Sequence, residues 1–334
     1  MSPDPSTVIS SPDSIFTIHS PEDFAACALK TFRFQAAHCH VYADYLRLLQ
    51  TDIDQIHSLE QIPHLPIELF KTHFVYCGPQ KPEMVFTSSA TTGMVPAQHP
   101  VASRKLYEES FSRTFRQFMG APSDYNLLAL LPSYLERQGS SLVYMVDKLM
   151  QQARKPHSGY YLYNHEELHH KLLLLQAQGQ PCLLVGVSFA LLDFAQACPL
   201  SFPELKIIET GGMKGRGQEL SRLELHSRLT QGFGTTQIYS EYGMAELLSQ
   251  AYAGEDGHFR TPPWMKISIR DLHNPFRSLP SGRRGGINII DLANRYSCAF
   301  IETQDLGIAH PDQSFEVLGR IPYSELRGCN MLLT

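Results

Sequence analysis

A hydroxyl-rich stretch, residues 87–93, is the first part of the sequence whose residue types suggest chemistry. It follows the apolar residues 84–86 and holds five small hydroxyl residues before a glycine. A loop of this kind can offer backbone N–H groups and hydroxyls to a phosphate chain. It lacks the ending of a Walker loop, and a plain Ser/Thr surface turn has the same composition. The candidate phosphate ligands are Ser88, Ser89, Thr91, Thr92 and Gly93.

Two adjacent glycines, Gly211 and Gly212, follow an apolar run at residues 205–208. Paired glycines at the carboxyl end of a strand allow a flat or charged ligand to approach the backbone closely. A tight turn before a helix that begins near Gln218 would need the same glycines. Met213, which follows the pair, is included among the candidate ligand contacts.

Residues 240–246 combine an aromatic ring, a glycine and a carboxylate. Tyr242 can stack on a base, and Gly243 leaves room for it. Glu246 supplies a hard oxygen ligand suited to Mg²⁺. The alternative interpretation is the start of an amphipathic helix with two exposed glutamates. The candidate contacts in this stretch are Glu241, Tyr242, Gly243 and Met244, with Glu246 as the metal ligand.

Asp305 and Arg320 are candidates for holding a sugar. A carboxylate can accept hydrogen bonds from both hydroxyls of a ribose, and an arginine can orient the carboxylate. Either residue by itself is more often a solvated surface charge.

Cys329 lies five residues before Thr334 and beside Arg327, which would favour its thiolate form. A thiolate is a nucleophile, whereas an isolated terminal cysteine is usually an idle thiol. Both interpretations stay open on the residues alone.

The elements that would position these residues alternate between apolar runs and helical patterns. Residues 107, 111, 115 and 118 are aromatic and recur at helical spacing, and Asn164 with Glu167 is typical of a helix start. This alternation predicts an α/β fold with a late β-rich section. A helical stretch is expected between Phe24 and Leu49, and strands at 127–131, 160–163, 183–187, 205–208, 287–290, 300–302 and 315–318.

Composition excludes several classes of protein. The formal net charge of −5 makes nucleic acid an unexpected partner. The seven cysteines form no Cys-x-x-Cys pair, so free thiols are expected. The first residues do not resemble a secretory signal, and the longest apolar run, 182–197, is too short to span a bilayer. We therefore expect a cytoplasmic protein without membrane contact.

Five stretches of the sequence occur in the order of the signatures of adenylate-forming enzymes, the superfamily of acyl-CoA ligases and firefly luciferase. They are residues 88–93, 211–212, 242–246, 303–305 and 319–320. Residues 88–93 resemble the phosphate loop, and Gly211–Gly212 resemble the adenine-side glycine pair. Residues 242–246 resemble the Tyr-Gly-x-Thr-Glu motif. Residues 303–305 resemble Thr-Gly-Asp, and 319–320 the hinge-side Gly-Arg. The resemblance implies ATP and Mg²⁺ as cofactors.

A narrower resemblance is to the acyl-protein synthetase family of bacterial bioluminescence. It is carried by residues 209–216, 240–244, 262–265, 289–294 and 325–329. It implies a fatty acid activated as an acyl-adenylate, a thioester on Cys329, and delivery to an acyl-reductase or carrier partner. It also implies one adenylation domain over residues 15–320, followed by a mobile tail at 321–334. Residues 1–14 are rich in Ser, Pro and Asp and are expected to form a loose tail. The small C-terminal domain of the larger ligases is expected to be missing.

Three residues depart from the superfamily pattern: Ala90, Ala245 and Gln304 replace glycine, threonine and glycine. The small domain of the larger ligases carries a catalytic lysine, and Lys214 or Arg216, which follow the glycine pair, are the candidates that replace its charge, with Lys214 taken as the catalytic residue. An acyl- or aryl-CoA ligase that uses free coenzyme A, and a non-catalytic binding relative, remain as alternatives.

Overall fold

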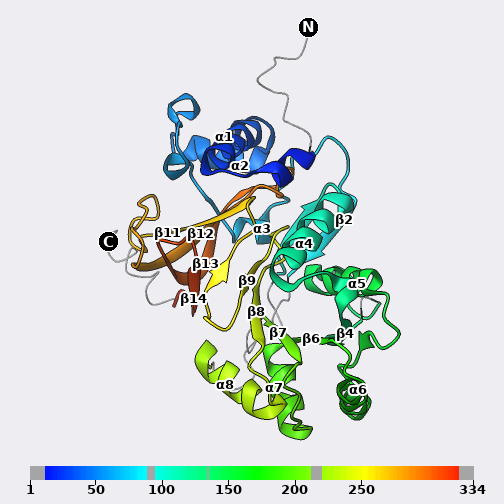
Figure 1. Ribbon diagram of the computed structural model, residues 1–334. Coiled ribbons are helices and arrows are strands. Elements are labelled where there is room, and N and C mark those ends of the chain that lie inside the picture. Colours follow the sequence, from blue (N-terminus) through cyan, green and yellow to red (C-terminus); the bar gives the residue numbers. More distant parts are fainter. Residues whose placement is uncertain (1–11, 89–94, 134, 212–219, 323–334) are drawn as a thin grey trace. The chain divides into compact units, whose positions relative to one another are not determined.

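The computed structural model describes residues 12–88, 95–133, 135–211 and 220–322 (Figure 1). The chain divides into two compact units that are interleaved along the sequence. Unit 1 comprises Met1–Ser110, Ala245–Ser249 and Thr261–Thr334, and unit 2 comprises Phe111–Met244 and Gln250–Arg260.

Unit 1 is built on an antiparallel sheet in the order β11-β12-β13-β14. The short β1 pairs in parallel with the beginning of β13, and β2 and β3 form a separate antiparallel hairpin. The strands are β1 (Leu65–Pro66), β2 (Met84–Thr87), β3 (Gln98–Val101), β11 (Met265–Arg270), β12 (Arg284–Asp291), β13 (Phe300–Ala309) and β14 (Phe315–Arg320).

The helices of unit 1 come from the N-terminal part of the chain. Short 3₁₀ turns lie at Pro12–Thr17, Ile53–Gln55 and Leu59–Gln61. The α-helices are α1 (Pro21–His38), α2 (His40–Leu48), α3 (Leu69–Thr72) and α4 (Arg104–Met119), the last of which continues into unit 2.

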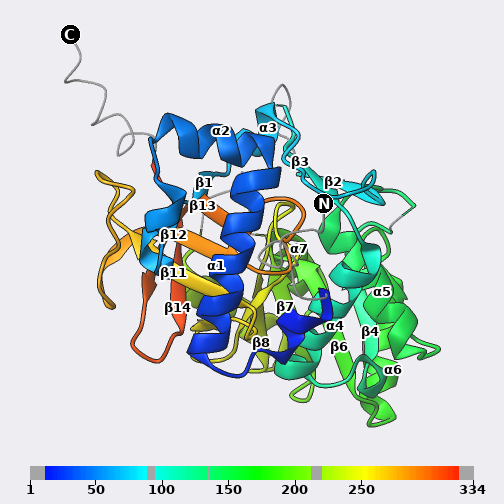
Figure 2. The ribbon, with the colours of Figure 1, turned by 90° about the horizontal axis from the view of Figure 1, so that it is seen from above.

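Helix α1 lies across the strands of the unit 1 sheet (Figure 2). Ser20 and Asp23 form a capping box at its start. The buried Gln35 donates from Nε2 to the carbonyls of Asn294 and Arg295 at 2.9 and 2.8 Å, and its Oε1 accepts the N–H of Ala299 at 2.9 Å. One amide therefore fixes the helix to the β12–β13 connection by pairing with buried backbone groups that need hydrogen-bond partners.

Unit 2 contains a mainly parallel sheet in the order β10-β9-β8-β7-β6-β4-β5. Strands β8, β7, β6, β4 and β5 are parallel to one another. Strand β9 pairs antiparallel with β8, and β10 pairs antiparallel with β9. The strands are β4 (Asn126–Leu130), β5 (Gly159–Tyr160), β6 (Cys182–Val187), β7 (Lys206–Thr210), β8 (Ile238–Tyr242), β9 (Ala251–Ala253) and β10 (Phe259–Arg260).

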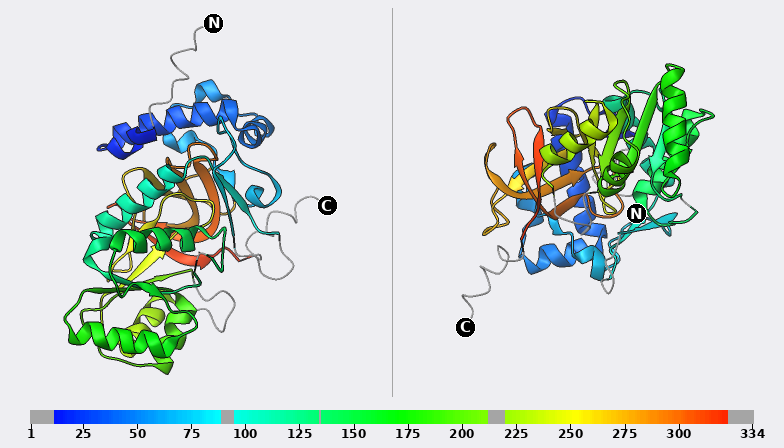
Figure 3. Two further views of the ribbon diagram at one scale, coloured as in Figure 1. Left: turned by 90° about the vertical axis from the view of Figure 1, so that its right-hand side faces the viewer. Right: turned by 90° about the horizontal axis from the view of Figure 1, so that it is seen from below.

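Helices cover both faces of the unit 2 sheet (Figures 1 and 3). Helix α5 lies on one face, and α6, α7 and α8 lie on the other. Every residue of β4 and β6 is buried, as expected for parallel strands between two helical layers. A 3₁₀ turn spans Pro122–Asp124, and the helices are α5 (Ser141–Ala153), α6 (His165–Ala177), α7 (Ser188–Ala197) and α8 (Arg222–Phe233).

The predicted α/β architecture is confirmed, and each predicted strand overlaps an observed one. Asn164 caps α6, with its Oδ1 accepting the N–H of Glu167 at 3.1 Å. The single helical stretch expected from Phe24 to Leu49 is instead two helices, because Cys39 has extended backbone angles. The strand predicted at residues 300–302 is observed but is longer than predicted, since β13 continues to Ala309.

The alternative of an amphipathic helix at residues 240–246 was wrong. Residues 238–242 form strand β8, and the side chains of Glu241 and Glu246 are buried rather than exposed. The described helices include none that is both long and apolar enough to cross a bilayer.

Candidate active site

Strands β7 and β8 bring two of the predicted stretches together in unit 2. They are parallel neighbours, with Glu209 opposite Ser240 and Thr210 opposite Glu241. Because the carboxyl ends of parallel strands meet at one edge, the residues after Thr210 and after Tyr242 leave the sheet side by side. Ligands of open α/β sheets bind at such edges.

Gly211 leaves β7 with φ of 76°, in the left-handed region that glycine enters without strain. Glycine is therefore needed at this position because the chain turns at the end of the strand. Such a turn is compatible with both a ligand contact and a purely structural role of the glycine pair. Gly212, Met213 and Lys214 lie outside the described residues.

The turn after β8 also needs its glycine. A Cβ on Gly243 would lie 2.4 Å from Oε1 of Glu241, so any side chain there would collide with the carboxylate. Tyr242 is buried, with its ring centroid 5.8 Å from that of Phe259, while Met244 is partly exposed. Stacking of a base on Tyr242 stays a prediction.

Two buried acids, Glu209 and Glu241, lie at the ends of these strands in unlike surroundings. Ser188 donates from Oγ to Glu209 at 2.7 Å, and His226 Nε2 lies 3.7 Å from the same carboxylate. Glu241 accepts a short hydrogen bond from the hydroxyl of Thr210. Sequence reasoning missed Glu209, although it precedes the glycine pair by two residues.

In unit 1, Asp305 and Arg320 lie opposite each other on β13 and β14. Arg320 Nε is 3.3 Å from Asp305 Oδ1, which makes the predicted partnership a direct ion pair. The Asp305 side chain is 14% exposed and that of Arg320 is 74% exposed, so the pair faces solvent through the arginine.

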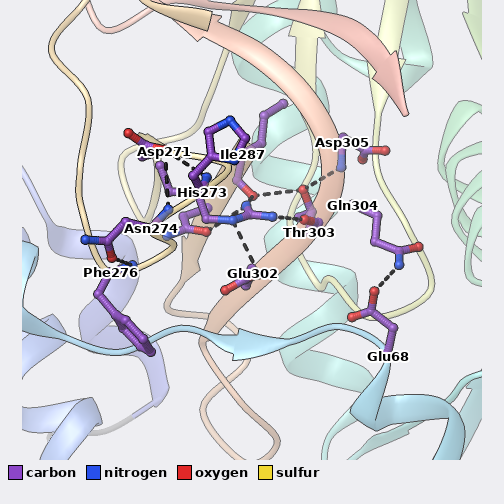
Figure 4. A network of polar contacts seen from close by, with 12 residues as sticks. Glu68, Asp271, His273, Asn274, Phe276, Ile287, Glu302, Thr303, Gln304 and Asp305 are labelled. Atoms are coloured by element: carbon purple, nitrogen blue, oxygen red, sulfur yellow. Dashed lines mark hydrogen bonds and ion pairs between the residues drawn. The ribbon is translucent and has the colours of Figure 1, made fainter. Parts of the chain in front are cut away.

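A buried arginine, Arg270, holds β13 through partners that include Ile287 and Thr303 (Figure 4). Arg270 donates from its guanidinium to the carbonyls of Ile287 and Thr303 at 2.8 and 2.6 Å. The Thr303 hydroxyl donates to Ile287 O at 2.8 Å and accepts the N–H of Asp305 at 3.1 Å. The Thr-Gln-Asp stretch is thus held by a residue from β11, a strand that sequence reasoning did not predict.

Gln304, which stands where related motifs have glycine, reaches away from Asp305. Its Nε2 donates to Glu68 in a short hydrogen bond (Figure 4). Glutamine at position 304 therefore attaches β13 to the segment that precedes α3. The neighbouring Asp305 remains paired with Arg320.

Glu246 belongs to the same unit as Asp305 and Arg320. Burial raises the pKa of its carboxyl, the positive charges of Arg320 and Lys71 lower it, and the charge of Asp305 raises it. The Glu246 carboxyl is therefore influenced electrostatically by both members of the Asp305–Arg320 pair, and its role as a metal ligand stays a prediction. Its backbone carbonyl accepts a hydrogen bond from Asn294 Nδ2 at 2.6 Å.

Asp291, a residue that sequence reasoning passed over, holds the backbone that follows Glu246. Its carboxylate accepts the N–H groups of Leu248 and Ser249 at 2.8 and 3.0 Å and the Ser249 hydroxyl at 2.6 Å. The available signal was an acid directly after the apolar run 287–290, where a buried carboxylate needs several donors.

Ser88 is the part of the hydroxyl-rich loop that the structure describes. Its N–H donates to Ala97 O at 3.1 Å, and its Oγ accepts the N–H of Ala97 at 2.9 Å. Ser88 therefore closes the base of the β2–β3 loop. Ser89, Thr91, Thr92 and Gly93 lie outside the described residues.

Cys329 also lies outside the described part of the chain. The described cysteines, at positions 27, 39, 77, 182, 198 and 298, are free thiols, as predicted from the absence of a Cys-x-x-Cys pair. Burial raises the pKa of the Cys182 thiol to about 12, which suits a structural cysteine rather than a nucleophile.

Several solved structures share this fold. ATP-bound MatB from Rhodopseudomonas palustris matches 71% of this chain at 17% identity with a TM-score of 0.53. A 2-hydroxyisobutyryl-CoA ligase, in complex with 2-HIB-AMP and CoA, matches 90% of this chain and 70% of its own at 14% identity, with a TM-score of 0.67. The amide bond synthetase McbA from Marinactinospora thermotolerans matches 73% of this chain and 50% of its own at 15% identity, with a TM-score of 0.51.

These proteins are adenylate-forming enzymes, and the likeness shows that the chain has their fold. The match covers 47% of MatB, so the chain spans about half the length of that protein. No curated protein sequence matches the chain. A family model does: the model described as "Acyl-protein synthetase, LuxE" matches residues 19–334, and the chain therefore belongs to that family.

Proposed function

We propose that the chain joins a carboxylic acid to AMP and then transfers the acyl group to its own Cys329. Membership of the acyl-protein synthetase family supports this reading. The structural observation that carries it is the grouping of Glu246, Asp305 and Arg320 in unit 1. A carboxylate that can hold a metal ion and an ion pair that can hold a sugar suit a bound nucleoside triphosphate.

Asp305 would accept the hydrogen bonds of both ribose hydroxyls, with Arg320 holding the carboxylate charged and oriented. In unit 2, the backbone at Gly211, Gly212 and Gly243 would lie against the adenine, with Tyr242 beside it. Met213, Glu241 and Met244 complete the proposed nucleotide surface. The hydroxyl-rich loop that begins at Ser88 would contact the phosphates.

Mg²⁺ fits the donor set, because this ion is usually bound by one or two carboxylates together with substrate phosphates and waters. Burial raises the pKa of Glu246 against its neighbouring positive charges, and a bound cation would favour the charged form. The ion would neutralise charge on the leaving pyrophosphate. Glu246 would hold the ion through its carboxylate.

The first step then needs positioning and charge stabilisation rather than a protein nucleophile. The substrate carboxylate attacks the α-phosphate, and pyrophosphate leaves. Lys214 would supply positive charge near the α-phosphate. In the second step the Cys329 sulfur attacks the acyl carbonyl and AMP leaves, which produces a thioester for an acyl-reductase or carrier partner.

Intact-mass measurement tests the proposal directly. The protein is incubated with ATP, Mg²⁺ and a mixture of fatty acids of different chain lengths and aromatic acids. The wild type is expected to gain the mass of one acid less one water, and Cys329→Ser is expected to gain none while still exchanging pyrophosphate into ATP. Cys198→Ser, which changes a partly buried thiol, is the matched control and should still be acylated.

Two outcomes would contradict the proposal. Full turnover of Cys329→Ser with added coenzyme A would identify a CoA ligase that uses a free thiol. Absence of pyrophosphate exchange with every acid would favour a non-catalytic binding protein. The mass gained by the wild type would also identify the acid, which neither the fold nor the family specifies.

A further inference from the structure

Unit 1 contains a cavity of about 470 Å³ beside its sheet. The strands β11, β12 and β13 form one side of it. The segment with the 3₁₀ turns Ile53–Gln55 and Leu59–Gln61 and the loop 275–278 form the others. Among the residues that line this cavity, all within the described part of unit 1, none is assigned to the nucleotide. Ligand pockets usually measure roughly 300–1,000 Å³, so the cavity is large enough for a small molecule.

Three polar residues form a row across the strands that border the cavity. Ser268 on β11 is in register with Asn288 on β12, and Asn288 is in register with Glu302 on β13. Residues opposite each other on paired strands share a face of the sheet, and neighbouring strands lie about 4.8 Å apart. All three line the cavity. The row therefore presents a hydroxyl, an amide and a carboxyl to the same space.

The buried Arg270 fixes the orientation of two members of this row. Its Nη1 donates to Asn288 Oδ1 at 3.0 Å, and its Nε lies 3.4 Å from Glu302 Oε1 (Figure 4). The amide nitrogen of Asn288 has no hydrogen-bond partner among the described residues, and it is accessible to solvent rather than buried. Because Asn288 lines the cavity, its NH₂ group is a donor that a ligand can use.

The charges around the row favour an uncharged ligand. Arg270 already pairs with Glu302 and donates to the carbonyls of Ile287 and Thr303. A carboxylate bound at the row would be repelled by Glu302, and an ammonium group would be repelled by Arg270. His64, which also lines the cavity, is neutral, because burial and the charge of Arg270 lower its pKa to about 3.

The other sides of the cavity are largely apolar. Ile56 and Ile62 come from the segment with the 3₁₀ turns, and Ile290 comes from β12; all three are buried. Phe276, from the loop after β11, is 59% exposed. These side chains suit an apolar ligand body. The charged lining residues other than Glu302 are exposed to solvent: Asp52, Glu60 and Lys266.

We propose that this cavity binds an uncharged amphipathic molecule through an amide head group and an apolar body. The ligand carbonyl accepts a hydrogen bond from the NH₂ group of Asn288, and the ligand N–H donates to the carboxylate of Glu302. A carbonyl oxygen beside an N–H group is the complement of this donor and acceptor. The ligand body packs against the isoleucines and Phe276. This binding requires neither ATP nor Cys329, so it is independent of the proposed function.

The test is a ligand-observed NMR titration of the full chain without ATP. The probes are octanamide, octylamine and octanoate, which share a similar apolar body and differ in the charge of the head group. Wild type is expected to bind octanamide. Asn288→Asp keeps an acceptor for Arg270 but replaces the NH₂ donor with an oxygen. The Kd for octanamide should then rise about tenfold or more, and octylamine should bind more tightly than to wild type.

A second variant changes the preference in the opposite direction. Glu302→Gln removes the negative charge beside Arg270, so octanoate should bind more tightly than to wild type. Gln180→Glu makes an amide-to-acid change at an exposed position of unit 2 and should leave all three Kd values unchanged. A purely structural role of the row would not produce gains for opposite charges. If one cavity variant does not fold, the gain expected of the other still decides.

The inference is overturned if octanamide does not bind wild-type protein. It is also overturned if the Kd values for the three probes are the same in wild type, Asn288→Asp and Glu302→Gln, because the amide then binds elsewhere on the chain. Failure of the proposed function would be seen separately, as wild-type protein that exchanges no pyrophosphate or forms no thioester, and it would leave the octanamide titration unaffected.

Discussion

Ser249 donates both its backbone N–H and its hydroxyl to the carboxylate of Asp291, at 3.0 and 2.6 Å. The same hydroxyl accepts the indole N–H of Trp264 at 3.0 Å. This fully buried arrangement fixes the chain three residues after Glu246, the proposed metal ligand. The position of the proposed metal ligand thus depends on an acid more than forty residues away from Ser249 in the sequence.

Replacement of Asp291 should destabilise unit 1. Asp291→Ala would leave the buried N–H groups of Leu248, Ser249 and Ala293 without their acceptor. Unpaired buried donors cost ~1–3 kcal/mol each, so we expect a loss of about 3–5 kcal/mol in the free energy of unfolding, measured with urea. Asp44→Asn, which breaks an exposed pair with Arg47, should change it by less than about 1 kcal/mol. Equal effects of the two variants would contradict the role of Asp291.

Gly286 is expected to tolerate no side chain. Its Cβ would lie 2.5 Å from Cζ of Arg270, whose guanidinium is held by the carbonyls of Ile287 and Thr303. Gly286→Ala should therefore cost roughly 1–3 kcal/mol of stability, because the arginine cannot move without losing buried hydrogen bonds. Gly254→Ala is the control, since its Cβ would make an ordinary contact at 3.9 Å with Tyr239. A thermal melt of each variant against wild type decides the comparison.

Loss of the Asp305–Arg320 pair should weaken nucleotide binding. Asp305→Asn keeps the shape of the side chain but removes its charge. Because a charge-assisted hydrogen bond contributes ~1.5–3 kcal/mol, the KM for ATP should rise about 10- to 150-fold. Arg320→Met should produce a smaller increase, because the arginine side chain is mostly exposed. Arg47→Met, at an exposed helix position, should leave the KM unchanged. An unchanged KM in Asp305→Asn would remove Asp305 from the nucleotide site.

Glu241 should make folding stability depend on pH in an unusual direction. Its pKa is raised to about 7 in the folded state against an ordinary 4.5, so the folded protein binds more protons than the unfolded chain between these values. Stability contributed by this residue is then present at low pH and is lost as pH rises from about 4.5 to 7, by about 1–3 kcal/mol. Urea unfolding over this range should give a flatter pH dependence for Glu241→Gln than for wild type. Parallel profiles would contradict the raised pKa.

Local patterns in the sequence were sufficient for the parallel core of unit 2. Apolar runs bounded by turn residues correctly indicated β4, β6 and β7, and the Asn164 cap correctly marked the start of α6, because these elements depend on their own residues. Residue chemistry and the family resemblance suggested Asp305 and Arg320 as partners, but local patterns did not place them in contact. Their contact depends on the register between β13 and β14, which no local pattern records.

The sequence by itself determined the α/β class, the free thiols and the order of the motifs. Tertiary structure decided which charged residues are buried and what they contact. The sequence does not relate Glu209 to Glu241, which come together because β7 and β8 pair. It also does not distinguish Arg270 from the other arginines, because the burial of Arg270 depends on the pairing of β11, β12 and β13. The physical reason is that the charge state and role of an ionisable group are set by desolvation and by hydrogen-bond partners, and strand pairing supplies both from distant parts of the chain.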